Sequence, residues 1–116
     1  MDKSTSDRKT ITLHYDDQTL NGFVKLIDRT IEIAKERIKH RDQGSPDVAP
    51  PGALENVVKA LYFRREQAMS GQLEPSGGEV TLGFLRAVGD WAGEPPDSAL
   101  VNAAADLEKY YLDEMK

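Results

Sequence analysis

The sequence predicts a mainly α-helical protein, a small four-helix bundle with a short N-terminal strand or extended arm. Two observations indicate this fold. Four segments carry apolar residues at helical spacing. Stretches rich in proline, glycine and polar residues separate them, at residues 42–52, 70–79 and 89–98. A chain of 116 residues has the length of one domain. We therefore expect a flexible N-terminus over 1–9 and a single helical domain over 10–116.

The N-terminal part predicts an extended segment. In "TITLHY", residues 10–15, apolar and polar residues alternate as they do in a half-buried strand. The nine residues before it carry charges of both signs and no apolar run, which is not the pattern of a secretory signal.

The first predicted helix runs from Thr19 to Arg41, with Asp17 or Thr19 as its N-cap. Leu26 and Ile33 lie off its main stripe, on a second and narrower one. Either this helix is central and touches neighbours on two sides, or the second stripe is a seam for a partner. The main apolar stripe is Leu20, Phe23, Val24, Ile27, Ile31, Ala34 and Ile38.

Three further helices are predicted. The second spans 52–70, directly after two prolines that suit a helix start. The third spans 81–91, although 79–83 is also compatible with a short strand. The last spans 97–115. The apolar face of the second is Leu54, Val57, Val58, Leu61, Tyr62, Ala68 and Met69. That of the third is Val80, Phe84, Ala87, Val88 and Trp91, and that of the last is Leu100, Ala103, Ala104, Leu107, Tyr111 and Met115.

Charge is distributed unevenly along the chain. The formal net charge is -5, and residues 89–116 carry seven acids against two lysines. The end of the first helix is basic. Either the two regions pair, within one molecule or between protomers, or each steers a different partner. The candidate steering residues are Arg29, Lys35, Arg37, Lys39 and Arg41.

The residue types present argue against catalysis. Without cysteine there are no disulfides, thiolate zinc sites or cysteine nucleophiles, and the cysteine-free composition fits the cytoplasm. His14 and His40 lie on different elements, and no nucleophile elbow or phosphate-binding loop is present. No apolar run has transmembrane length. We expect no enzyme activity, no metal, no cofactor and no membrane partner.

The stretch "ALYFRREQ", residues 60–67, combines aromatics with arginines. On the second helix, Phe63 points away from the apolar face, whereas Arg65 projects from it. We therefore predict that Phe63 contacts another surface. We expect Arg65 to pair with an acid of its own chain, either Glu66 or an acid of the last helix.

These observations predict a small, non-catalytic, cytoplasmic protein–protein interaction module: an adaptor, an assembly or regulatory subunit, or an immunity-type inhibitor. Its partner is another protein or a second copy in a homodimer. The candidate partner-binding residues are Leu26, Ile33, Phe63 and Trp91. The alternative is a nucleic-acid-associated regulator that uses the basic end of the first helix. The acidic balance of the chain argues against nucleic acid.

Overall fold

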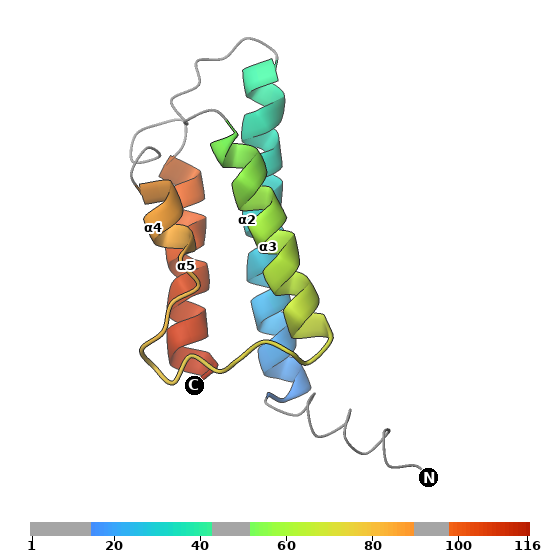
Figure 1. The fold of residues 1–116 in the computed structure, drawn as a ribbon, viewed down its shortest axis with the longest axis vertical. Coiled ribbons are helices and arrows are strands. Elements are labelled where there is room, and N and C mark those ends of the chain that lie inside the picture. The colour runs from blue at the N-terminus through green and yellow to red at the C-terminus, as the bar shows by residue number, and fades with distance from the viewer. Residues whose placement is uncertain (1–14, 43–51, 90–97) are drawn as a thin grey trace.

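The computed structural model describes residues 15–42, 52–89 and 98–116. Within them the chain forms α2 (Asp17–Asp42), α3 (Ala53–Met69), α4 (Phe84–Gly89) and α5 (Ser98–Glu114), and no strand (Figure 1). The prediction of a mainly helical bundle is confirmed. The strand expected over 10–15 falls, except for Tyr15, outside the described residues.

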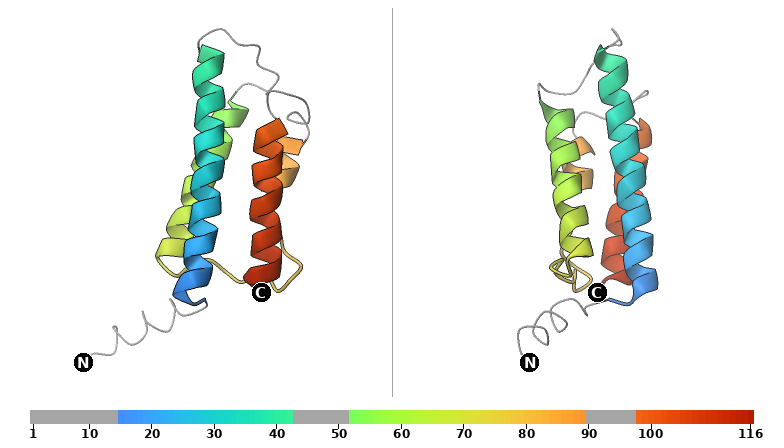
Figure 2. Two further views of the ribbon diagram at one scale, coloured as in Figure 1. Left: turned by 180° about the vertical axis from the view of Figure 1, so that it is seen from behind. Right: turned by 90° about the vertical axis from the view of Figure 1, so that its right-hand side faces the viewer.

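The longest helix, α2, is the centre of the bundle. It packs along α3 on one side and along α5 on the other, while α4 packs on α5 and only touches α3 (Figures 1 and 2). The apolar stripe predicted for the last helix is buried in full, so the helical spacing identified the core face of α5 correctly. The buried residues of this stripe are Leu100, Ala103, Ala104, Leu107 and Tyr111 of α5, and Met115 directly after it.

Helix α2 begins two residues earlier than its predicted start. The side-chain Oδ1 of Asp16 accepts a hydrogen bond of 2.8 Å from the backbone N–H of Thr19. This contact satisfies one of the free amides of the first turn, so Asp16 is the N-cap. The prediction of Asp17 or Thr19 was wrong, because the cap oxygen bonds three residues ahead and the helix starts one residue after the cap.

The cap makes stability depend on pH. Hydrogen bonds from the backbone and side chain of Thr19 lower the pKa of Asp16 below its ordinary value. The carboxyl group of Asp16 therefore binds its proton more tightly in the unfolded chain than in the folded protein. The stabilisation by the cap is present above a pH of about 4 and disappears as the pH falls through the folded pKa. Asp16→Asn retains a capping oxygen without the titration. We expect its denaturation midpoint to fall less steeply below pH 5 than that of the wild type; parallel curves would contradict this assignment.

Helix α3 covers less of the core than its sequence predicts. Leu54, Val57, Leu61 and Ala68 are buried as expected. Two residues predicted on the same face, Tyr62 and Met69, are instead 46% and 62% exposed. The reason is that α3 packs closely on α2 alone, so the edges of its apolar face stay uncovered.

The segment between α3 and α4 is held against one end of the bundle by buried side chains and hydrogen bonds. Leu73 and Ser76 are buried, and the N–H of Ser76 donates to the carbonyl of Met115 at 2.8 Å. The Tyr111 hydroxyl donates to the carbonyl of Glu74 at 2.5 Å, and that of Tyr15 to the carbonyl of Leu73 at 3.3 Å. These contacts carry the chain across the end of the bundle and bring it back along α5 to the start of α4.

Helix α4 is shorter than predicted. It starts at Phe84 rather than at 81, and residues 79–83 form neither a strand nor the start of the helix. Val80, predicted on its buried side, is exposed. The left-handed backbone of Gly83, with φ +87°, separates the irregular segment from the helix.

Candidate functional site

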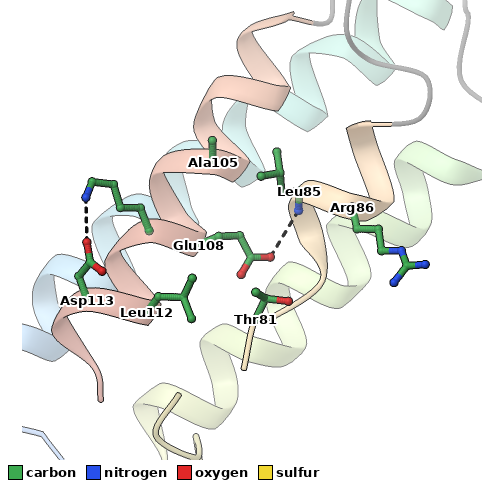
Figure 3. A pocket seen from close by; sticks show the side chains of 8 residues that line it. Thr81, Leu85, Arg86, Ala105, Glu108, Leu112 and Asp113 are labelled. Carbon is green, nitrogen blue, oxygen red and sulfur yellow. Dashed lines mark hydrogen bonds and ion pairs between the residues drawn. The ribbon is translucent and has the colours of Figure 1, made fainter. Parts of the chain in front are cut away.

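A hollow lies between α4 and α5. We call it the α4/α5 groove; it is open to solvent and has a volume of about 500 Å³ (Figure 3). Leu85, Ala105 and Leu112 supply its apolar surface. The complete lining is Thr81, Leu85, Arg86, Ala105, Glu108, Lys109, Leu112 and Asp113.

A buried carboxylate holds the two walls of this groove together. Glu108 is 4% exposed and points from α5 toward the first turn of α4 (Figure 3). Its Oε1 accepts a hydrogen bond of 2.7 Å from the N–H of Leu82. Its Oε2 accepts bonds of 2.7 Å from Phe84 and 3.4 Å from Leu85. The amides of Phe84 and Leu85 are free donors of the first turn of α4, and that of Leu82 lies just before the helix.

The role of Glu108 was missed from the sequence, where it was counted only as one of the seven acids of residues 89–116. A signal was available, because Glu108 follows the buried Ala104 by four residues and precedes the buried Tyr111 by three. An acid at this spacing falls beside the core stripe. Since buried carboxylates require hydrogen-bond donors, Glu108 had to meet donors from another segment.

The rims of the groove carry charges of both signs. On α5, Lys109 Nζ lies 2.8 Å from Asp113 Oδ2. This contact raises the pKa of Lys109 and lowers the pKa of Asp113. On α4, Arg86 points away from Glu108 (Figure 3), and it makes no hydrogen bond or ion pair with any other described residue. The groove thus has an apolar floor and one cation available to a ligand.

Most charged groups of the groove are already engaged within the protein. The Glu108 oxygens are occupied by backbone amides, and the lining contains neither histidine nor cysteine. Among residues 15–42, 52–89 and 98–116, no group of three possible ligands is placed to hold a metal ion.

A second hollow lies on the other side of α4, against α3. It has a volume of about 370 Å³ and contains no charged side chain. Ala60 and Ala87, both exposed, face it from the two helices. Its lining is Ala53, Asn56, Val57, Ala60, Leu82, Gly83, Phe84 and Ala87. The short α4 is therefore flanked by hollows on both sides.

The outer surface of α3 carries exposed apolar side chains. We define the α3 face as Lys59, Tyr62, Phe63, Glu66 and Met69, all of which are exposed. Phe63 is 60% exposed and so points outward, as the helical spacing predicts. The Arg64 guanidinium carbon lies 5.9 Å from the centre of the Phe63 ring. That Phe63 contacts another surface stays a prediction.

The other predicted partner-binding residues do not join this face. Leu26 and Ile33 are half-buried and pack against the core. Each lines a small hollow between α2 and α5, of about 200 Å³ at Leu26 and about 300 Å³ at Ile33. Their positions favour the alternative that α2 is a central helix with two neighbours. Trp91 lies outside the described residues.

The five basic residues predicted to steer a partner have different surroundings. Arg29 Nη1 lies 3.5 Å from Asp106 of α5, so the basic and acidic regions pair here within one molecule. Lys35 Nζ donates to the Tyr62 hydroxyl at 3.2 Å. Arg37 is 4% exposed, which is not the environment expected of a steering charge. Lys39 is exposed, and the side chain of Arg41 lies outside the described part.

Arg65 pairs with an acid of its own chain, as predicted. Its Nε donates to Asp28 Oδ1 of α2 at 2.7 Å. The predicted acids, Glu66 or one of the last helix, were wrong. The apolar edge of α3 that carries Arg65 packs against α2 rather than α5, so an acid of α2 is the nearest partner.

Comparisons of the chain with protein-family models, curated proteins and solved structures gave no match. Within the described ranges, none of the helices has both the length and the apolar content that crossing a membrane requires.

Proposed function

We propose that this protein is a small, non-catalytic, cytoplasmic interaction module, an adaptor or regulatory subunit, that binds a segment of a partner protein in the α4/α5 groove. The observation that carries the proposal is an open groove of about 500 Å³ whose floor is apolar and whose rim includes Arg86, which pairs with no acid of the described residues. Grooves of this kind between helices receive the apolar face of an amphipathic helix.

The lining defines the chemistry of the partner segment. Leu85, Ala105 and Leu112 favour aliphatic or aromatic anchors, and full burial of one such side chain stabilises a complex by about 1.5–3 kcal/mol. A carboxylate beside the anchors would pair with Arg86, because guanidinium and carboxylate groups form strong charge-assisted hydrogen bonds. The segment we propose is an amphipathic helix with two apolar anchors and one acidic residue.

Position-specific photo-crosslinking tests this proposal. A benzophenone amino acid at Leu85 reports from within the groove, and the same group at Lys25 reports from the exposed side of α2. In cells that naturally make the protein, we expect one major adduct from position 85 and none from position 25. Ala105→Gln fills the groove and should reduce the adduct by about tenfold.

The matched control is Asn102→Gln, which lengthens an exposed side chain of α5 outside the groove. It should leave the adduct unchanged. Equal labelling from positions 25 and 85, or equal adduct yields with Ala105→Gln and Asn102→Gln, would show that the partner does not bind in the groove.

A further inference from the structure

We infer that the α3 face is a self-association surface, on which two copies of the chain pair their α3 helices antiparallel about a two-fold axis between Tyr62 and Phe63. The inference rests on the proposed interaction function and names a second copy of this chain as one partner. A dimer of this kind presents two α4/α5 grooves.

Exposed apolar side chains are concentrated on this helix. Of the five large apolar side chains that are exposed in the described residues, α3 carries Tyr62, Phe63 and Met69. Tyr62 and Met69 are seven residues apart and lie on one line along the helix, with Phe63 beside it. Aromatic side chains at the centre of a patch are typical anchors of protein interfaces.

The charges of the α3 face are complementary to themselves in one orientation. Lys59 and Glu66 lie on the same face, and neither side chain makes a hydrogen bond or ion pair with another described residue. In an antiparallel pair about an axis between Tyr62 and Phe63, Lys59 of each copy lies opposite Glu66 of the other. Tyr62 of each copy then lies opposite Phe63 of the other. A parallel pair would instead place like charges together.

The electrostatics of the whole chain favour this surface over others. Each copy carries a net charge of -5, so two copies repel wherever their acidic surfaces meet. The α3 face contains one lysine and one glutamate and is neutral. The exposed side of α5, by contrast, carries Asp106, Asp113 and Glu114 against Lys109.

Charge reversal combined with sedimentation equilibrium tests the inference. Wild type is expected to be a dimer. In a homodimer of either single variant, Lys59→Glu or Glu66→Lys, positions 59 and 66 carry the same charge at both contacts. Each variant should therefore weaken dimerisation by about tenfold or more. The double variant restores opposite charges at both contacts and should dimerise as the wild type does. An equimolar mixture of the two single variants should form a heterodimer, because position 59 of each variant then lies opposite an opposite charge at position 66 of the other.

Lys39→Glu makes the same charge change on an exposed position of α2 outside the α3 face, and it should leave dimerisation unchanged. A monomeric wild type, single variants that dimerise like Lys39→Glu, or a double variant that stays monomeric would each overturn the inference. Crosslinking from position 85 separates this failure from failure of the proposed function. A monomer that still gives the groove adduct refutes self-association alone.

Discussion

Replacing Glu108 with glutamine is expected to lower the free energy of unfolding by about 2 kcal/mol, and replacing it with alanine by about 4 kcal/mol. The carboxylate accepts hydrogen bonds from three backbone N–H groups at the start of α4. Glutamine keeps the shape but turns an NH₂ group toward one of these donors. Alanine leaves all three donors unpaired in a buried environment, where each unsatisfied group costs about 1–3 kcal/mol.

Chemical denaturation measures this loss, and amide hydrogen exchange localises it. We expect faster exchange at Leu82, Phe84 and Leu85 in Glu108→Gln. Glu114→Gln is the matched control, because it makes the same chemical change at an exposed position of the same helix and should alter stability by less than about 0.5 kcal/mol. If the two variants were equally stable, Glu108 would not be what fastens α4 to α5.

Gly22→Leu is expected to destabilise the bundle by about 3 kcal/mol, and Gly22→Ala by about 1 kcal/mol. A Cβ at Gly22 would lie 2.8 Å from Tyr110 Cζ and closer still to the hydroxyl oxygen. That hydroxyl donates to the carbonyl of Thr19 at 2.9 Å, which fixes the ring against α2. Alanine at an open helical position would instead stabilise by about 0.5–1 kcal/mol relative to glycine.

The sign of the Gly22→Ala effect should reverse once the tyrosine ring is removed. In a Tyr110→Ala background we expect the alanine to stabilise by up to about 1 kcal/mol, as measured in a double-mutant cycle by urea denaturation. Gly89→Ala serves as the control, because nothing in the described structure lies within 4 Å of its Cβ position. Gly22→Ala and Gly89→Ala with equal effects would contradict close packing of α2 on α5.

Helical spacing predicted the core best where a helix is covered along its whole length. The stripe of α5 from Leu100 to Met115 is buried in full because α2 and α4 both pack against it. The prediction that Tyr62 and Met69 belong to the buried face of α3 was wrong for a related reason. Helical periodicity identifies which residues share a face. How much of that face is buried depends on how many neighbouring helices pack against it.

The parts of the site that depend on distant residues were not accessible from sequence patterns. Arg65 was expected to meet an acid, but its partner Asp28 is 37 positions away and follows from the packing of α3 on α2. Glu108 and the amides of residues 82–85 are brought together in the same way. The outward position of Phe63, in contrast, is local to one helix and was predicted correctly.

Hydrogen exchange of the purified complex with the crosslinked partner tests directly whether a partner segment binds in the α4/α5 groove. We expect slower exchange over residues 81–86 and 105–113 in the complex than in the free protein, and no change on the exposed side of α2. Slower exchange confined to α2, with the residues of the groove unaffected, would contradict binding in the groove.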